Sequence, residues 1–506
     1  MNRRTFLVAG TVASLLRSRA FPGQPNTSGH HLPASDVHYR RTLSYIEETP
    51  VSGYHWASDA AYERFRDLKF GVRVHWGLYS ILGLPGESWP FLAKSFPERA
   101  AYNQMYRTWN PTGFDAEQWL ELFQAGGAKV FSFTTKHHEG FSMFATSTRV
   151  HSRVDWAAPD APRIVPCNHA YSIMETPFAR DVTGELCVAA QKRGIAVDLY
   201  FSHPDWYDVD FRPYALHPLQ TSVSIQDPEV QRRQSQGARF TVVPDPTPAE
   251  AARMMRRHRD QLTELLTRYG RIDMLCLDQW LGPAVWPELR QTLLHIRTLQ
   301  PDVMLRARGI GNYGDYYTPE RFVPSGKENS SLPWFVIDPL GRSFSYESDP
   351  ANYKGSDWII RNLVDSVSKG GNFMVGIGPD GNGRFSDEAT RQLIRVGSWL
   401  RINGEGIYAT RPRAGELWHE GDSIRYTASK DQRKAYAFAL AWPGKNLNLR
   451  TVRPKRSSAI SLLGYDKPLE WAWDTASGTS IKLPDDLQDE THRPCRTAWC
   501  FKILVA

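Results

Sequence analysis

The middle of the chain repeats one pattern: an amphipathic helix, a Gly or Pro stop, and a short apolar strand that ends in polar residues. The pattern predicts helix–strand units at Asp115–Thr134, Thr183–Ser202, Thr247–Asp278, Trp286–Arg308 and Asp357–Gly378. An earlier predicted strand, Phe70–His75, has no clear helix before it. Alternating helices and strands indicate parallel strands with helical crossovers, because a tight turn cannot join a parallel pair. The chain is therefore expected to be an α/β protein.

Polar and aromatic side chains stand at the ends of several different predicted strands. They are His75, Trp76, Lys136, His137, His138, Tyr200, Asp278 and Arg308. A barrel gathers the carboxyl ends of its strands around one mouth, whereas a doubly wound sheet concentrates such residues at one switch point. We therefore favour a (β/α) barrel of the TIM type, irregular around Glu320–Tyr346, where no clean strand–helix unit is visible.

The pattern changes after a last predicted helix, Ser386–Arg401. Short alternating runs follow at Ser423–Thr427, Lys434–Leu440, Leu469–Trp473 and Trp499–Val505. Such runs are typical of antiparallel strands with one buried face. We expect a linker over 21–45, a catalytic barrel over 46–409 and a small C-terminal antiparallel β-sandwich over 410–506.

Residues 1–20 read as a targeting segment, which we exclude from the fold. Arg3 and Arg4 precede a short apolar stretch, Thr5–Leu16, which is too short to span a bilayer, and the pair resembles a twin-arginine export signal. We expect a bacterial protein that is periplasmic or secreted, with no membrane partner. Beyond this segment 57 basic residues face 54 acidic ones, so no nucleic-acid partner is expected.

His137 and His138 directly follow a predicted strand. Consecutive strand residues point to opposite faces, so neighbouring His side chains do not easily share an ion, and we predict no metal and no cofactor. A bend at the strand end would allow both rings to bind a metal. A purely structural role, with one His hydrogen bonded to the backbone and the other exposed to water, also stays open. We favour hydrogen bonding to a polyol, because His, Lys, Trp and Tyr supply donors and stacking rings.

A match to G-x-G-x-x-G at Gly309–Gly314 follows an apolar strand, but no amphipathic helix comes after it. The helix terminus that would face a phosphate is missing, so we predict a flexible active-site loop and no dinucleotide site.

Two carboxylates are better candidates for chemistry. Asp278 ends an apolar strand, where a carboxylate is costly unless it faces a polar mouth, and Glu320 lies on the next crossover. A retaining glycosidase needs two carboxyl groups about 5 Å apart, one as nucleophile and one as acid/base. The pair fits that chemistry, although each residue taken alone has a structural explanation as well. No Gly-x-Ser-x-Gly elbow is present, so serine-hydrolase chemistry has little support.

Four segments resemble motifs of a known family, the α-L-fucosidases of glycoside hydrolase family 29. They are KFGVRVHWGLY at 69–79, AKVFSFTTKHHEGFSMF at 128–144, DLYFSHPDW at 198–206, and the long closing run that begins with GGNFMVGIGPDGNGRF at 370. The resemblance spans about 50–412 in order. It implies a (β/α)-type barrel, a C-terminal β-sandwich, and an exo-acting retaining enzyme that removes terminal α-L-fucose from fucosylated oligosaccharides or glycans.

The resemblance also assigns site residues. Asp278 matches the nucleophile, Glu320 the acid/base, and Arg308 the arginine upstream of it. The residues that match sugar-binding positions are His75, His137, His138, Tyr200, Phe344 (against the fucose methyl), Glu87 and Trp89.

Some positions depart from the family pattern. Cys276 stands where a Trp is usual, Ser88 splits the usual Glu-Trp pair, and Phe335 replaces a Glu. These changes leave open a related substrate, such as an α-L-galactoside or a sulfated fucan oligomer, or a weakly active sugar-binding protein. The linkage cleaved, the oligomeric state, and whether Cys495 and Cys500 form a disulfide or stay free are also open.

Overall fold

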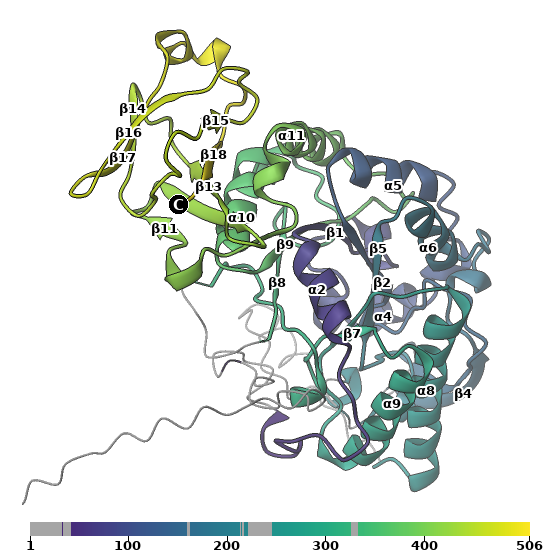
Figure 1. Ribbon diagram of the computed structural model, residues 1–506. Coiled ribbons are helices and arrows are strands. Elements are labelled where there is room, and N and C mark those ends of the chain that lie inside the picture. Colours follow the sequence, from purple (N-terminus) through teal and green to yellow (C-terminus); the bar gives the residue numbers. More distant parts are fainter. Residues whose placement is uncertain are drawn as a thin grey trace, which may run out of the picture.

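The computed structural model describes residues 33, 42–158, 162–212, 214, 217–220, 245–324 and 332–506. The predicted export signal and most of the predicted linker lie outside these residues. Figure 1 shows a barrel-like α/β body with a smaller β region packed at one side of it, next to α10 and α11. None of the helices within the described part of the chain has both the length and the apolar character to cross a bilayer.

Seven parallel strands form the central sheet, in the order β7-β6-β5-β2-β1-β9-β8. Their bounds are β1 (Phe70–Val74), β2 (Val130–Lys136), β5 (Ala196–Ser202), β6 (Met274–Asp278), β7 (Met304–Leu305), β8 (Phe335–Pro339) and β9 (Asn372–Ile377). From β1 the order runs outward through β2, β5 and β6 to β7, while on the other side β9 pairs with β1 and β8 forms the opposite edge, so the strands follow one another in sequence order around the barrel. This is the TIM-like half barrel that the sequence predicts.

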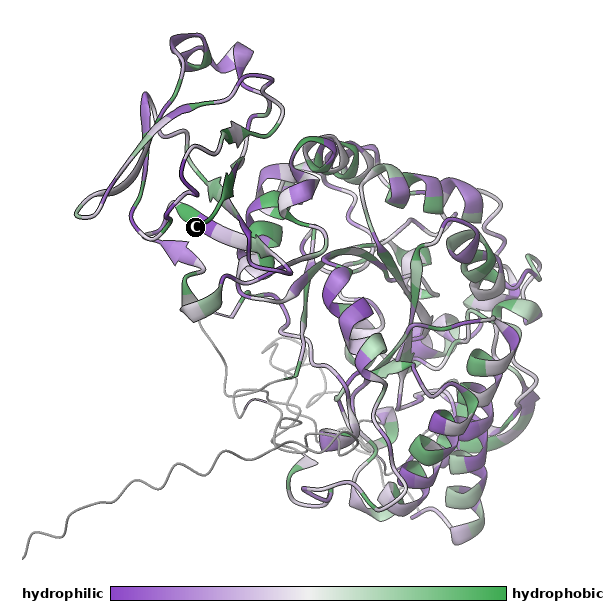
Figure 2. Ribbon diagram, viewed as in Figure 1, coloured by the Kyte–Doolittle hydropathy of each residue, from purple (hydrophilic) through white to green (hydrophobic). Residues whose placement is uncertain are grey.

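Helices surround this sheet. They are α2 (Asp59–Asp67), α3 (Tyr79–Leu82), α4 (Phe96–Tyr102), α5 (Ala116–Ala125), α6 (Val182–Lys192), α8 (Pro248–Arg268), α9 (Trp286–Leu299), α10 (Ser356–Ser368) and α11 (Asp387–Asn403). A separate antiparallel pair, β3 (Val150–Asp155) and β4 (Arg163–His169), lies between β2 and α6 in the chain. The helices turn hydrophobic faces toward the sheet and hydrophilic faces outward (Figure 2).

A connecting segment, Tyr316–Glu320, joins the two edges of the half barrel. Isolated parallel bridges link Tyr316 to Arg306 beyond β7, and link Tyr317 and Glu320 to Trp334 and Ile337 at β8. The ring is therefore closed by single bridges where other barrels have a regular strand. This irregular closure falls in the stretch where the sequence shows no strand–helix unit, and it carries Glu320 to the mouth.

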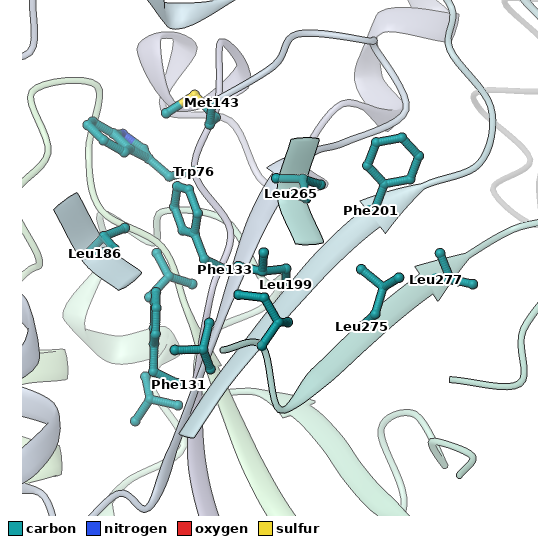
Figure 3. Packing of buried hydrophobic residues seen from close by; sticks show 14 of the residues in the cluster. Trp76, Phe131, Phe133, Met143, Leu186, Leu199, Phe201, Leu265, Leu275 and Leu277 are labelled. Carbon is teal, nitrogen blue, oxygen red and sulfur yellow. The ribbon is translucent and has the colours of Figure 1, made fainter. Parts of the chain in front are cut away.

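The barrel strands alternate between two environments. Phe131, Phe133, Leu199, Leu275 and Leu277 point to the helices and pack with Leu186 of α6 and Leu265 of α8 (Figure 3). The residues between them point into the barrel, where polar side chains meet. Burying each such leucine or phenylalanine contributes about 1.5–3 kcal/mol, so the outer face stabilises the barrel and leaves the inner face free for polar groups.

Local sequence signals explain most helix starts. Thr247 caps α8 through the predicted capping box, with Glu250 bonded back to the Thr247 amide and Pro248 at the first helical position. Such caps are worth about 1 kcal/mol each, because they satisfy amides that have no partner within the helix.

Three elements differ from the prediction. The statement that no helix precedes the first strand is wrong, because α2 leads directly into β1. Its buried face is made of Ala61, Tyr62 and Phe65, which a count of aliphatic residues misses. The strand β8 was also not expected, and the predicted strand Val303–Arg308 is regular only over β7.

The Gly309–Gly314 segment is also different from its prediction. It forms a buried 3₁₀ turn, η8 (Gly311–Tyr313), instead of a flexible loop. The carbonyl groups of Asn312 and Tyr313 accept hydrogen bonds from Trp56 and from the Tyr54 hydroxyl. The glycines therefore serve a turn that packs against the segment before α2.

The C-terminal region forms two antiparallel sheets, as predicted. The larger contains β10 (Thr410–Arg411), β11 (His419–Glu420), β12 (Ile424–Ser429), β13 (Lys434–Ala439), β15 (Ile460–Leu462) and β18 (Trp499–Leu504), and the smaller contains β14 (Asn446–Leu449), β16 (Glu470–Asp474) and β17 (Gly478–Lys482). Residues from both, such as Tyr426, Leu449, Ile481 and Phe501, share one hydrophobic cluster. The sheets therefore pack face to face.

Candidate active site

Asp278 is the last residue of β6 and stands at the mouth of the barrel. One carboxylate oxygen, Oδ2, accepts a hydrogen bond of 2.6 Å from the Tyr200 hydroxyl. The other, Oδ1, accepts one of 2.9 Å from Arg308 Nη1 and lies 3.4 Å from Arg306 Nη1. The side chain is only 9% exposed. A carboxylate held by a phenol and two guanidiniums is fixed in position and ready to act as a nucleophile.

Arg308 links Asp278 to Glu320. Its Nη2 donates a hydrogen bond of 2.6 Å to Glu320 Oε2, while its Nη1 holds Asp278. Burial alone would raise the pKa of Glu320, but the charges of Arg308 and Arg306 outweigh it and hold this pKa below its usual value. One guanidinium that touches both carboxylates fits the short separation, about 5–5.5 Å, found between the two carboxyl groups of retaining enzymes.

The two adjacent histidines turn to the same side of the barrel. β2 ends at Lys136 with a register irregularity, so His137 and His138 follow the strand and their ring centroids lie 4.1 Å apart. The expectation that neighbouring side chains face opposite ways does not hold beyond this bulge. Within the described ranges, no cluster of three or more potential metal ligands is present.

Serine hydroxyls and Asp278 surround these rings. The Ser88 hydroxyl is hydrogen bonded to His137 Nδ1, and the Ser202 hydroxyl lies 2.6 Å from His138 Nδ1. The other nitrogen of His138, Nε2, lies 3.9 Å from Asp278 Oδ2. Burial lowers the pKa of His138 well below its usual value, so the ring is neutral near pH 7 and acts as a polar contact without charge.

His75 lies just beyond β1, among aromatic rings. Its centroid lies 5.0 Å from Phe344, 5.6 Å from Tyr200 and 5.8 Å from His137. Burial lowers the pKa of His75 well below its usual value. Its Nδ1 atom is buried and has no hydrogen-bond partner in the part of the chain that the structure covers. A neutral imidazole with an unused nitrogen beside a ring suits a ligand that has both hydroxyl and C–H groups.

Glu87 lies in the loop before η2 (Trp89–Ala93), and Trp89 is the first residue of η2; both reach the same mouth. The Glu87 carboxylate is buried and accepts a hydrogen bond of 2.9 Å from the Ser345 amide, next to Phe344. Burial raises the pKa of Glu87. The Trp89 ring lies edge-on to His138, with centroids 4.8 Å apart. All ten predicted site residues therefore belong to one connected group.

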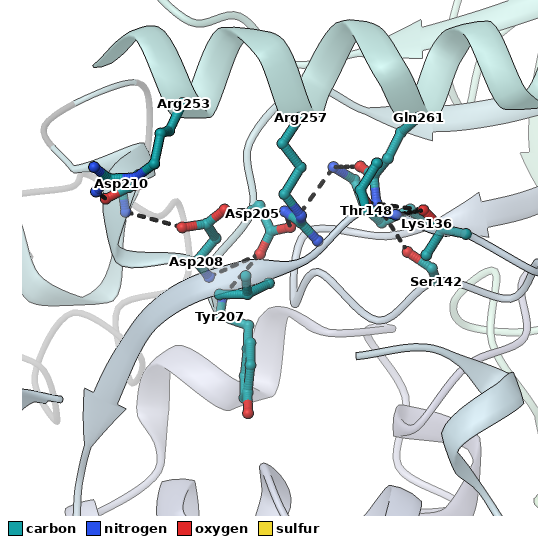
Figure 4. Close-up of polar contacts among 12 residues, drawn as sticks. Lys136, Ser142, Thr148, Asp205, Tyr207, Asp208, Asp210, Arg253, Arg257 and Gln261 are labelled. Carbon is teal, nitrogen blue, oxygen red and sulfur yellow. Dashed lines mark hydrogen bonds and ion pairs between the residues drawn. The ribbon is translucent and has the colours of Figure 1, made fainter. Parts of the chain in front are cut away.

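Lys136 does not join this group, although its place beside the histidines suggests a donor at the mouth. Its Nζ atom is fully buried on the helix side, 3.3 Å from Gln261 Oε1 and 3.8 Å from Asp205 Oδ2. Arg257 of α8 donates to Asp205 at 2.7 Å (Figure 4). Lys136 therefore anchors the end of β2 to α8 behind the site, because the register irregularity between Thr134 and Lys136 interrupts the alternation and turns it outward.

Sequence reasoning missed several side chains that touch the site. Arg306 approaches Asp278 directly, and Trp206 packs 5.5 Å from His138 and 5.6 Å from Trp89. The signal for Arg306 was its position two residues before Arg308, which places both on the inner face. Trp206 ends the third resembling motif, so the motif contained it without assigning it a role.

The arrangement combines a fixed carboxylate, a second carboxylate on the same guanidinium, neutral imidazoles and aromatic rings. Such a set can bind a sugar ring and perform nucleophilic and acid/base chemistry at one carbon.

Comparison with known proteins gives the family. Residues 47–405 match the family model described as alpha-L-fucosidase, and residues 420–504 match the alpha-L-fucosidase C-terminal domain. The chain is 28% identical over 469 residues to tissue alpha-L-fucosidase of Mus musculus, covering 87% of this chain and 91% of the mouse protein. It is 26% identical over 493 residues to alpha-L-fucosidase of Branchiostoma floridae, covering 92% of this chain and 95% of the Branchiostoma protein.

Solved structures share the fold. Alpha-L-fucosidase isoenzyme 1 of Paenibacillus thiaminolyticus superimposes with a TM-score of 0.70 at 24% identity, over 88% of this chain and 99% of that one. An alpha-L-fucosidase of Bacteroides thetaiotaomicron superimposes with a TM-score of 0.69 at 23% identity, over 91% of this chain and 98% of that one. Because the first family model spans most of the chain and the second follows it in order, this protein belongs to the α-L-fucosidase family of glycoside hydrolases.

Proposed function

We propose that this protein is an exo-acting, retaining α-L-fucosidase in which Asp278 is the nucleophile and Glu320 the acid/base. The observation that carries the proposal is the single guanidinium of Arg308 that holds both carboxylates. In support of a retaining mechanism, the structure of a related Bacteroides thetaiotaomicron α-L-fucosidase is described as a trapped covalent intermediate formed with 2-fluoro-fucosyl fluoride.

In the first step, an Asp278 oxygen attacks the anomeric carbon while the bond from that carbon to the leaving oxygen breaks. Glu320 gives its proton to the leaving oxygen, so the aglycone departs as a neutral alcohol. In the second step, Glu320 takes a proton from water, the water oxygen bonds to the anomeric carbon, and Asp278 leaves as a carboxylate. Arg308 and Tyr200 favour this departure, because both donate to the carboxylate that re-forms.

The remaining site residues bind the sugar in this proposal. His75, His137 and His138 contact the three ring hydroxyls, Phe344 and Trp89 cover C–H groups, and Glu87 fixes the loop that carries Phe344. The neutral rings of His75 and His138 suit this role because they bind hydroxyls without attracting counterions.

We also propose the wider context. The substrate is a fucosylated oligosaccharide or glycan. The enzyme is exported by a bacterium to the periplasm or the medium, and the support for this is the pair of arginines near the start of the chain. The catalytic unit is assigned to 46–409 and the β-sandwich to 410–506.

The test is the Asp278→Ala variant on a nitrophenyl α-L-fucoside. Without its nucleophile the enzyme is expected to lose at least about 1000-fold in kcat, since removing one member of a catalytic set costs that order. NMR of the wild-type reaction should show the α-anomer of fucose first, since two displacements retain configuration. Wild-type turnover in Asp278→Ala, or initial release of the β-anomer, would reject the mechanism. Fucose binding without turnover by the wild type would favour a sugar-binding protein.

A further inference from the structure

Glu139 is a buried carboxylate that the proposed mechanism does not use. It is the third residue of a turn that follows β2, in which the Gly140 amide donates to the His137 carbonyl at 3.1 Å. Glu139 Oε2 lies 3.7 Å from His137 Nδ1, and both side chains are at most 5% exposed. The turn therefore places this carboxylate next to a ring that is proposed to bind the sugar.

The surroundings of Glu139 contain little that could compensate its charge. Among the described residues its one ion-pair partner is the His137 imidazole, and its Oε2 atom accepts no hydrogen bond. Its other neighbours include the phenols of Tyr79 and Tyr102: burial raises the pKa of both well above the usual value, and the Glu139 charge raises them further. A buried carboxylate is costly unless a charge or a hydrogen bond compensates it, so the imidazole is its expected partner.

The Nδ1 atom of His137 has a second neighbour, the hydroxyl of Ser88. Ser88 is 1% exposed and is the residue that separates Glu87 from Trp89 in this chain. A carboxylate only accepts hydrogen bonds, whereas a hydroxyl can accept or donate, so both neighbours are satisfied when Nδ1 carries a hydrogen. The other ring nitrogen, Nε2, is then the one left for the sugar.

Aromatic contacts hold the plane of the His137 ring but do not decide its orientation within that plane. The Tyr200 ring stacks on it at 5.6 Å with 14° between the planes, and Tyr79 lies edge-on at 5.7 Å. A 180° flip exchanges ring nitrogens with ring carbons and keeps the plane, so these contacts hardly distinguish the two orientations. Glu139 and Ser88 are polar and favour the orientation in which Nδ1, rather than a carbon, faces them.

We propose that Glu139 and Ser88 are positioning residues that fix the orientation of His137 and the hydrogen on its Nδ1, so that Nε2 contacts one hydroxyl of the sugar ring. This inference rests on the proposed function, in which His137 binds a ring hydroxyl. Neither residue touches the sugar or the reacting atoms; both act through the imidazole, because the partner of one ring nitrogen sets the state of the other.

The test measures kcat/KM for nitrophenyl α-L-fucoside and for its 2-, 3- and 4-deoxy analogues. His137→Ala should cost least for the analogue that lacks the hydroxyl bound by His137. Glu139→Gln should lower the value about 3- to 10-fold for the fucoside and the other two analogues, the effect of one hydrogen bond, and by less than about twofold for that analogue. Ser88→Ala, which leaves the carboxylate in place, should give the same pattern, and this pattern decides if Glu139→Gln does not fold.

Glu264→Gln is the matched control. Glu264 is also a buried carboxylate whose Oε2 atom lacks a partner in the described part of the chain, but it belongs to α8, outside the barrel strands. Its other oxygen accepts a hydrogen bond of 2.9 Å from the Ser147 amide. Glu264→Gln should change none of the four values by more than about twofold.

The outcomes separate the positioning role from its alternatives. Equal losses for all four substrates in Glu139→Gln and Ser88→Ala would indicate a purely structural role and overturn the proposal, and so would unchanged values in both variants. If His137→Ala affects the four substrates alike, His137 binds no single hydroxyl and the positioning role fails with it. A wild type that hydrolyses none of these fucosides rejects the proposed function itself.

Discussion

Arg308 contacts both of the candidate catalytic carboxylates. Its planar fork presents two parallel donors, and each holds a different carboxylate, Asp278 at 2.9 Å and Glu320 at 2.6 Å. The contact with Glu320 favours the ionised carboxylate, yet a general acid must carry a proton when the glycosidic bond breaks. In the proposed mechanism Arg308 therefore aligns the two groups while shifting the pH range in which Glu320 carries its proton toward the acid side.

Replacing Arg308 should move the pH profile in a defined direction. Arg308 lowers the pKa of Glu320, so kcat/KM falls as pH rises through that lowered value. In Arg308→Met the pKa of Glu320 rises, because an adjacent opposite charge is lost, and the fall should move to higher pH. The maximum kcat/KM should drop as well, because Asp278 loses a hydrogen-bond donor.

Arg308→Lys is the matched control, since it keeps the charge but loses the fork. Its falling limb should stay closer to the wild type than that of Arg308→Met. A limb that remains in place in Arg308→Met would show that Glu320 is not the acid, or that another cation sets its pKa. The measurement is kcat/KM for a nitrophenyl α-L-fucoside across pH.

At this scale the sequence predicted the mouth residues and missed the layer below them. Asp278 and the histidines stand at strand ends, where polar residues in apolar runs are conspicuous. Cys276 lies inside β6 and Arg306 directly follows β7, and nothing in a one-dimensional pattern shows that the guanidiniums of Arg73 and Arg306 meet at the Cys276 sulfur. Lys136 illustrates the opposite error. It is next to His137 in the sequence and was expected at the mouth, but its side chain points toward α8 instead.

The end of β2 shows how one element positions the site. The bulge before Lys136 lets His137 and His138 turn to one side, and Gly140 follows with φ of +87°. A Cβ on Gly140 would lie 2.0 Å from Asp205 Oδ1. Asp205 cannot yield easily, because Arg257 and the amides of Tyr207 and Asp208 hold it. The turn after the histidines thus depends on glycine for both its φ and its space.

Gly140→Ala should therefore be strongly destabilising. We expect a loss of at least about 3 kcal/mol in the free energy of unfolding, from strain and from displacement of a buried ion pair. Activity should fall as well, because His138 is only two residues away. Urea denaturation and fucoside hydrolysis measure the two effects.

Gly194→Ala provides the comparison. Gly194 has φ of +65°, but a Cβ there meets nothing within 4 Å, so the cost is the backbone strain alone, about 1–2 kcal/mol. Its activity should be unchanged. Equal losses for Gly140→Ala and Gly194→Ala would contradict the role assigned to the Asp205 contact.

Elements with strong local signals were the ones that sequence could predict. The α8 capping box and the glycine stops after α5 and α6 place those helices within a few residues. α2 was missed because its buried face mixes Ala, Tyr and Phe with charged residues. β8 and the connecting segment were missed because only their partners across the ring define them, and that pairing is not local.

At the scale of the whole molecule, the C-terminal sheets and the barrel share one hydrophobic cluster. Tyr436, Phe438, Ala498 and Cys500 belong to the cluster that also contains the barrel core. Trp399 of α11 donates a hydrogen bond of 2.6 Å to the Thr497 carbonyl. Continuous packing of this kind couples the unfolding of two regions, because neither can expose its side of the contact alone.

An ion pair adds to this contact. Arg425 of β12 donates to Asp365 of α10 at 2.6 Å. Both groups are partly buried, and the pair joins the sheet to the helix. The small sheet of β14, β16 and β17 lies further from the barrel (Figure 1) and packs in the cluster that it shares with the larger sheet.

Phe438→Ala tests the coupling. Phe438 is fully buried on β13, and its ring lies 6.2 Å from Trp399. Removing it should cost about 3–5 kcal/mol, the range for a buried Phe replaced by Ala. Because the contact joins the regions, fucoside hydrolysis and tryptophan fluorescence should be lost at the same lowered temperature. Trp473→Ala, which removes a 37% exposed ring on β16, should cost less than about 1 kcal/mol. If Phe438→Ala lowered the fluorescence transition but left the temperature of activity loss unchanged, the sheets and the barrel would be independent units, and the shared cluster would have no role in stabilising the catalytic barrel.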